Sequence, residues 1–184
     1  IHYGKGDETL KDTARVLSEY ANVLMIRTSS HKNLDEFAKY SNIPVINGLS
    51  DKSHPCQVMS DILTFEEHLG SIEGKKIAWI GDGNNNMSNS FIEASVKFKF
   101  NLNIGCPKKY SPSSKILNWA KKNKSTVLVT TNPKDAVKDA DCIMTDKWVS
   151  MNDKVNKKEK KKSLKNYQVN KKLISLAKNE CIFM

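Results

Sequence analysis

The residues of this sequence that could do chemistry lie directly after its apolar runs. Arg27 ends one such run, and His54 and Gln57 follow the next. A guanidinium at the end of a strand suits a bidentate contact with a phosphate or carboxylate, although a surface arginine is equally compatible with the position. A histidine at the head of a helix is held neutral by the helix dipole and could donate to a carbonyl oxygen, while in isolation it is more typical of a cap.

A second polar group follows the later apolar runs. Residues 81–86 read Gly-Asp-Gly-Asn-Asn-Asn, which lacks the third glycine of a dinucleotide loop, so cofactor binding is the poorer interpretation. Asn85 and Asn86 are typical helix caps, but their amides also suit the carboxylate and ammonium of an amino acid. Asp146 is a natural partner for a substrate ammonium, or else an ordinary turn residue.

The elements that must position these residues alternate between helix and strand. Apolar spacing predicts helices at residues 8–21, 34–40, 54–69, 86–98, 113–122, 134–138 and 168–178. Strands are predicted at residues 23–27, 44–47, 75–80, 102–105, 126–131, 142–146 and 181–184. This alternation implies parallel sheets with crossover helices, in which ligands bind at the carboxyl ends of strands. The predicted fold class is α/β, with two doubly wound, Rossmann-like domains that meet near residues 70–74.

Composition narrows the class of protein further. The apolar runs are a few residues long, whereas a membrane span needs about 20, and the first residues lack the pattern of a signal peptide. The four cysteines are far apart and have no histidine at ligand spacing, which predicts reduced thiols, no zinc site and a cytoplasmic protein. The net charge of +10 is concentrated in seven lysines between residues 154 and 165. We interpret this run, which has no aromatic residue, as a solvated helix face or loop rather than a nucleic-acid patch.

Taken in order, several segments resemble the ornithine carbamoyltransferase family, and they span nearly the whole chain at the family's spacing. They are residues 12–17, 44–51, 54–57, 81–87 and 146–151, with Tyr-Gln-Val-Asn at 167–170 as a further match. The resemblance implies transfer of a carbamoyl group from carbamoyl phosphate to the side-chain amine of L-ornithine, which gives citrulline and phosphate in arginine metabolism. It also implies that the full-length protein is a homotrimer or higher homo-oligomer with active sites between subunits, and that no metal or organic cofactor is needed.

The resemblance assigns parts of the chain to the two substrates. Residues 1–54 would be the C-terminal part of the first domain, which is only partly present and binds carbamoyl phosphate. Residues 55–70 would be a connecting helix, and residues 71–184 an ornithine-binding domain that is incomplete at its C-terminal end. In the first domain, Arg27 and His54 would be catalytic, and together with Gln57 they would bind carbamoyl phosphate. In the second, the ornithine-binding residues would be Asn85, Asn86, Asp146, Ser150 and Met151.

Two departures from the family pattern qualify this assignment. The family's Ser-Met-Gly loop ends in Asn152 here, which leaves another acceptor such as putrescine open. The family's Ser-Thr-Arg-Thr and His-Cys-Leu-Pro motifs would lie before Ile1 and after Met184, so we expect residues 1–184 alone to be inactive. The alternative from a different class is a catalytically dead basic binding module that uses the lysine run. The sequence does not distinguish arginine synthesis from arginine breakdown.

Overall fold

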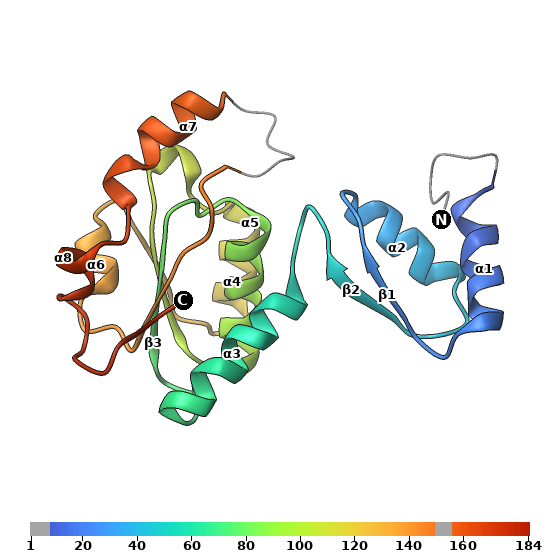
Figure 1. Ribbon diagram of the computed structural model, residues 1–184, viewed down its shortest axis with the longest axis horizontal. Helices are drawn as coiled ribbons and strands as arrows, with labels where there is room; N and C mark the ends of the chain where they lie inside the picture. The colour runs from blue at the N-terminus through green and yellow to red at the C-terminus, as the bar shows by residue number, and fades with distance from the viewer. Residues whose placement is uncertain (1–7, 150–155) are drawn as a thin grey trace. The chain divides into compact units, whose positions relative to one another are not determined.

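The structure is a computed structural model that describes residues 8–149 and 156–184 (Figure 1). The chain forms two compact units, Ile1–Cys56 and Gln57–Met184, which we call the N-terminal and C-terminal units. The boundary falls in the first turn of helix α3, Pro55–Leu69. Every strand pair among the described residues is parallel, which confirms the predicted α/β fold class.

The N-terminal unit is a two-stranded sheet with two helices. In chain order its elements are α1 (Leu10–Tyr20), β1 (Leu24–Arg27), α2 (His31–Tyr40) and β2 (Val45–Leu49). Its buried apolar side chains come from the helices and include Ala14, Leu34 and Phe37. Helix α2 begins three residues before the predicted start because Ser30 caps it by accepting a hydrogen bond from the backbone N–H of Asn33.

The C-terminal unit is built on a five-stranded sheet of order β5-β4-β3-β6-β7. Its strands are β3 (Lys76–Ile80), β4 (Asn101–Gly105), β5 (Val127–Thr130), β6 (Cys142–Met144) and β7 (Ile182–Phe183). Besides α3, its α-helices are α4 (Asn86–Phe98), α5 (Ser114–Lys122), α6 (Pro133–Val137), α7 (Lys157–Leu164) and α8 (Lys171–Ile174). Two 3-10 turns, η1 (Lys108–Tyr110) and η2 (Lys165–Tyr167), complete the unit.

Helices cover both faces of the five-stranded sheet (Figure 1). Strand β3 shows why, since its side chains alternate between two apolar clusters. Ile77 and Trp79 pack with residues of α3, α4 and α5 on one face. Ala78 and Ile80 pack with residues of α6 and α8 on the other. A strand buried on both faces reads as a continuous apolar run, which is why this strand was predicted correctly.

The strand order reverses between β3 and β6. Strands β4 and β5 follow β3 toward one edge, while β6 and β7 extend toward the other. In open parallel sheets this reversal leaves a crevice outside the carboxyl ends of the two central strands, where ligands bind. The loops after β3 and β6 are therefore the places to look for a site in this unit.

The predicted helix at residues 168–178 is wrong in extent. Only α8 is helical there, and the chain after it bonds to the loop before β6 instead of continuing the helix. The backbone N–H of Asp139 donates to the carbonyl of Leu176, and that of Lys178 donates to the carbonyl of Ala140. These bonds to a distant segment replace helical ones, so tertiary contact overrides the local apolar pattern.

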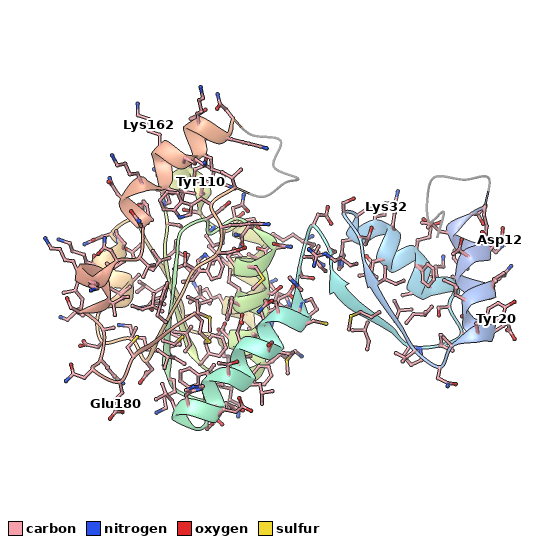
Figure 2. All side chains as sticks on the ribbon, viewed as in Figure 1. Asp12, Tyr20, Lys32, Tyr110, Lys162 and Glu180 are labelled. Carbon is pink, nitrogen blue, oxygen red and sulfur yellow. The ribbon has the colours of Figure 1, made fainter. Side chains whose placement is uncertain are left out.

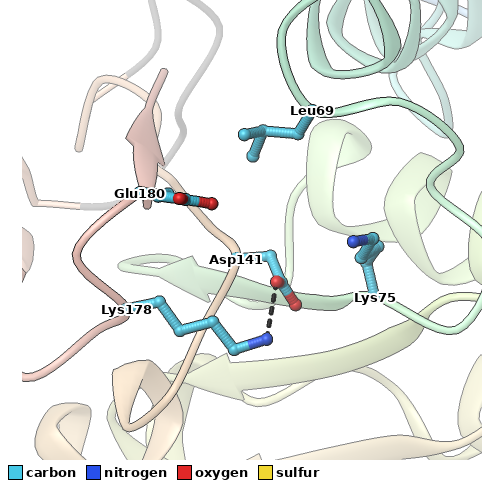
Figure 3. A pocket seen from close by; sticks show the side chains of 5 residues that line it. All are labelled: Leu69, Lys75, Asp141, Lys178 and Glu180. Atoms are coloured by element: carbon cyan, nitrogen blue, oxygen red, sulfur yellow. Dashed lines mark hydrogen bonds and ion pairs between the residues drawn. The ribbon is translucent and has the colours of Figure 1, made fainter.

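An ion pair fastens this same segment to the sheet beside a small pocket of about 70 Å³ (Figure 3). Lys178 Nζ lies 2.7 Å from Asp141 Oδ1, and the backbone N–H of Lys76 donates to Asp141 Oδ2 at 2.8 Å. Burial by itself raises the pKa of Asp141, but the hydrogen bonds from Lys178 and Lys76 outweigh it. The pKa of the folded carboxyl is therefore lower than the ordinary value of 3.8.

This shift predicts a pH-dependent stability. Because the folded pKa of Asp141 is depressed, its contribution is present above pH 3.8 and is lost as pH falls through the folded pKa. We expect Asp141→Asn to be less stable than the unaltered chain at neutral pH and the difference to shrink in acid. Urea unfolding followed by tryptophan fluorescence at a series of pH values measures this. Glu180→Gln, which removes an exposed carboxylate from the same pocket, is the control. A difference that stays constant with pH would contradict the assignment.

Candidate functional site

Arg27 and Thr28 lie at the carboxyl edge of the N-terminal sheet. Arg27 is in register with Leu49 after an irregularity in the pairing, and the backbone N–H of Thr28 donates to the carbonyl of Leu49 at 2.9 Å. The Arg27 side chain is exposed at this edge. A guanidinium in this position is available to an anionic ligand that approaches the ends of β1 and β2.

His54 follows a tight turn at the end of β2. The backbone N–H of Ser50 donates to the carbonyl of Ser53 at 2.8 Å, and the Ser53 N–H donates to Ser50 Oγ at 3.2 Å. Asn47 in β2 donates its side-chain N–H to Ser53 Oγ at 3.0 Å. These bonds fix the residue before His54, and Pro55 begins α3 directly after it. The histidine is thus placed by a rigid turn at the same sheet edge as Arg27.

His31 was missed by the sequence analysis. Its Nδ1 lies 2.8 Å from the hydroxyl of the fully buried Ser50, and its backbone N–H donates to Asp51 Oδ1 at 2.7 Å. These contacts join the start of α2 to the turn that precedes His54. The signal was available, because Ser30 before His31 is a typical cap and marks a histidine at the head of a helix.

Gln57 lies in the first turn of α3 and is exposed. Its side-chain N–H donates to Asp61 Oδ1 at 2.9 Å, one helical turn further on. This intrahelical bond orients the amide along the helix surface. A role for Gln57 in the same site as His54 stays a prediction.

The loop after β3 holds the Asn85 and Asn86 predicted for an amino acid. Asn85 caps α4, with its Oδ1 accepting from the Ser88 N–H at 2.8 Å, and Ser88 Oγ donates back to the carbonyl of Gly83 at 2.7 Å. A Cβ at Gly83 would lie 2.9 Å from both the Cys106 sulfur and the carbonyl oxygen of Tyr110. Only glycine fits there. The loop is therefore closely packed against Cys106 and Tyr110 and is also held by the cap of α4.

Asp82 in this loop forms a buried ion pair with Lys160 of α7. Lys160 Nζ lies 2.7 Å from Asp82 Oδ2, and both side chains are only 6% exposed. The other carboxylate oxygen accepts from the Asn84 N–H at 2.8 Å. The interpretation of the lysine run as a solvated helix face or loop agrees with the exposed lysines of α7 but is wrong at Lys160. One signal could have found it, because Lys160 lies one turn before Leu164 and so shares its helix face, which is buried.

Asp146 lies beyond β6, next to the loop after β3. The hydroxyl of Thr145 donates to the carbonyl of Ile80 at 2.7 Å, so the carboxyl ends of β3 and β6 are joined directly. Asp146 is exposed, and its Oδ1 accepts from the adjacent Lys147 N–H. It borders an open hollow of about 250 Å³ lined by Thr145, Asp146, Lys147, Trp148, Gln168, Val169 and Phe183.

The C-terminal unit therefore brings Asn85, Asn86 and Asp146 to the same edge of one sheet, on both sides of the strand-order reversal. This is the arrangement expected of a ligand site in an open parallel sheet. Ser150 and Met151, the other two residues predicted to bind ornithine, lie outside the described residues.

Cysteine chemistry at this site is disfavoured by burial. Burial raises the pKa of the Cys106 thiol, which lies under the loop after β3, and the pKa of the Cys142 thiol in β6. Protonated thiols are poor nucleophiles and poor metal ligands. Across residues 8–149 and 156–184, no group of three His, Cys, Asp or Glu side chains is placed to hold a metal ion. Nor does that part of the chain contain a helix of the length and apolarity needed to cross a bilayer.

Two family descriptions match the chain. The description of the aspartate/ornithine carbamoyltransferase carbamoyl-P binding domain matches residues 1–67, and that of the Asp/Orn binding domain matches residues 73–184. The ornithine carbamoyltransferase of Rhodopseudomonas palustris is 50% identical over all 184 residues. The match spans 58% of that relative, so the chain is a little over half as long as the curated proteins it resembles.

Solved structures agree with this match. The ornithine carbamoyltransferase from Pyrococcus furiosus superposes with a TM-score of 0.89 at 41% identity, over 98% of this chain and 58% of that one. The anabolic ornithine carbamoyltransferase from Campylobacter jejuni superposes with a TM-score of 0.91 at 35% identity, over 100% of this chain and 61% of that one.

Proposed function

The chain belongs to the aspartate/ornithine carbamoyltransferase family, and on that premise we propose that it is part of an enzyme that carbamoylates the side-chain amine of L-ornithine. The products would be citrulline and phosphate. The observation that carries the proposal is the placement of Asn85, Asn86 and Asp146 at the reversal of strand order, within residues matched to the Asp/Orn binding domain. Relatives at up to 50% identity that are named for ornithine favour it as the acceptor over aspartate.

In this proposal Arg27 and His54 of the N-terminal unit bind carbamoyl phosphate, together with Gln57 from the first turn of α3. Arg27 would bind the phosphate, and His54 and Gln57 would donate to the carbamoyl oxygen. The uncharged amine of ornithine attacks the carbonyl carbon and the new C–N bond forms. The C–O bond to phosphate then breaks, and the proton lost by the nitrogen passes to the departing phosphate. Positive charge and N–H donors aimed at the oxygens stabilise the charge that develops there. Orientation of the two substrates supplies much of the remaining rate.

The C-terminal unit would bind the amino acid end of ornithine. The carboxylate of Asp146 is the partner for the α-ammonium, and Asn85 and Asn86 would bind the backbone of the substrate. The side-chain oxygen of Asn85 already caps α4, so any contact of Asn85 with ornithine falls to its NH₂ group. Ser150 and Met151, which follow Asp146 in the sequence, complete the proposed acceptor site.

The wider proposal places the complete protein in arginine metabolism, in the cytoplasm and as a homotrimer without a metal or organic cofactor. Residues 1–184 span 58% of the Rhodopseudomonas palustris relative, and we propose that they do not complete the reaction by themselves. Putrescine is retained as an alternative acceptor because of Asn152. A basic nucleic-acid module is less favoured, because the central lysine of the basic helix is buried against Asp82.

A chimera tests the proposal. Residues 1–184 replace the matching segment of the Rhodopseudomonas palustris enzyme, and ureido product is measured with carbamoyl phosphate and ornithine, putrescine or aspartate. We expect citrulline with ornithine from the chimera and no product from residues 1–184 alone, since the chimera also contains the part of the relative that residues 1–184 do not match. A folded chimera that carbamoylates putrescine but not ornithine would replace the proposed acceptor. A folded chimera that is inactive with all three acceptors would contradict the proposed function.

A further inference from the structure

Among the lysines of the run that the structure describes, Lys160 has an environment that differs from the others. Lys157, Lys158, Lys161 and Lys162 of α7 are exposed, whereas Lys160 is only 5% exposed. Figure 2 shows Lys162 on the outer side of α7, away from the labelled Tyr110, which lies on the inner side. A buried ammonium is costly unless it is paired, so its retention calls for a partner of opposite charge.

Lys160 has that partner in Asp82 and is further enclosed by an aromatic ring. Its Nζ lies 2.7 Å from Asp82 Oδ2 and 5.7 Å from the centre of the Tyr110 ring. Tyr110 belongs to η1. Lys109, the residue before it in η1, forms an ion pair with Glu159 on the exposed side of α7. Among the described residues, helix α7 therefore has a buried ionic contact and an exposed one with other parts of the unit.

Of these two contacts, the buried one reaches the loop that bears the proposed acceptor residues. Asp82 binds Lys160 through one carboxylate oxygen and the Asn84 N–H through the other. Its own carbonyl accepts from Trp79 Nε1 at 2.9 Å. Asp82 is thus the point at which α7, β3 and the start of the Asn84–Asn86 segment are joined.

We propose that Lys160 and Asp82 are positioning residues for the amino acid acceptor, acting through the loop that carries Asn85 and Asn86. Lys160 holds the Asp82 carboxylate, Asp82 orients the Asn84 N–H, and the loop is thereby held in the conformation that binds the acceptor. Neither residue contacts the substrate in this mechanism. The inference rests on the proposed function for its substrate, but the ionic tether itself can be measured without substrate.

The test compares Lys160→Gln with Glu159→Gln, which breaks the exposed ion pair between α7 and η1. In residues 1–184, NMR is used to follow the backbone amides of residues 81–86 and the indole N–H of Trp79. In the chimera, KM for ornithine and kcat are measured.

We expect Lys160→Gln to shift the amide signals of residues 81–86, to speed exchange of the Trp79 indole proton, and to raise KM for ornithine about tenfold or more with a smaller change in kcat. We expect Glu159→Gln to change none of these, and Lys160→Arg, which keeps the charge, to restore most of the affinity.

The outcomes separate the two proposals. Unchanged amide and indole signals in Lys160→Gln overturn the tether, whatever the chimera does. Shifted signals with an unchanged KM for ornithine overturn the positioning role and leave the ion pair purely structural. If Lys160→Gln does not fold, Asp82→Asn takes its place, because the amide oxygen can still accept from the Asn84 N–H while the NH₂ group that replaces Oδ2 cannot accept from Lys160. A folded chimera that makes no citrulline with the unaltered segment contradicts the proposed function, and the NMR comparison still decides the tether.

Discussion

Replacing Asp82 by alanine is expected to lower the unfolding free energy of the C-terminal unit by about 3–5 kcal/mol, the range found when one partner of a buried ion pair is removed. The ammonium of Lys160 would then stay buried opposite a methyl group, and the Asn84 N–H would lose its acceptor. Urea unfolding measures the change. Tryptophan fluorescence is a suitable probe because all three tryptophans, Trp79, Trp119 and Trp148, lie in this unit.

The double variant Asp82→Ala with Lys160→Met distinguishes an unpaired charge from a general loss of packing. We expect it to recover a large part of the lost stability, since the costly buried charge is gone and methionine fills a similar volume. Lys161→Met is the control, because Lys161 is exposed on the same helix and should change stability by less than about 0.5 kcal/mol. A double variant no more stable than Asp82→Ala would show that the ion pair is not the reason for the effect.

Replacing Arg27 by alanine in the chimera is expected to lower kcat/KM for carbamoyl phosphate by about 10²–10³-fold, the typical effect of removing one strong donor from oxygens on which negative charge develops, here those of the departing phosphate. The physical reason is its position, since the exposed guanidinium ends β1 at the edge where the turn before His54 lies. Initial rates of citrulline formation at saturating ornithine give the value. The kcat/KM of Arg27→Lys should fall between those of the unaltered chimera and Arg27→Ala, because lysine keeps the charge and loses the bidentate geometry.

Lys32→Ala is the matched control for the Arg27 variant. It removes one exposed positive charge from the same unit, in the first turn of α2, and is labelled in Figure 2. We expect kcat/KM to stay within about twofold of the unaltered chimera, because a screened surface charge contributes little. Equal losses for Arg27→Ala and Lys32→Ala would mean that net charge, not a specific contact, accounts for the effect.

The comparison of the two units shows how differently their proposed sites are built. In the N-terminal unit, Arg27 is carried on a strand end and His54 on a short turn closed by Ser50 and Ser53. In the C-terminal unit, the loop with Asn85 and Asn86 is held by a helix cap, by the close packing at Gly83 and by a buried ion pair. The loop with Asn85 and Asn86 therefore depends on more contacts with other parts of its unit, and a substitution at any of these contacts could change the site.

Much of the fold followed from the sequence because its signals are local. The apolar run at residues 77–80 predicted a strand at 75–80, which is β3 (Lys76–Ile80) in the structure, and the alternation of strands with helices predicted parallel sheets. The polar residues after each apolar run were predicted to form ligand sites for a related reason, since the carboxyl ends of parallel strands share one edge of the sheet. Segments in the right order across the chain were then enough to indicate the family, and the matches over residues 1–67 and 73–184 confirm it.

The tertiary structure alone decided the contacts between residues that are far apart in the chain. Periodicity describes which face of an element is apolar, but it carries no information about which distant side chain faces it. The pairing of Lys160 with Asp82, the contact of His31 with Ser50 and the shortening of the helix near α8 all depend on such partners. Lys160 shows the reason most clearly. Composition predicted a solvated lysine at this position, and only the packing of α7 against η1 and the loop after β3 removes its ammonium from water.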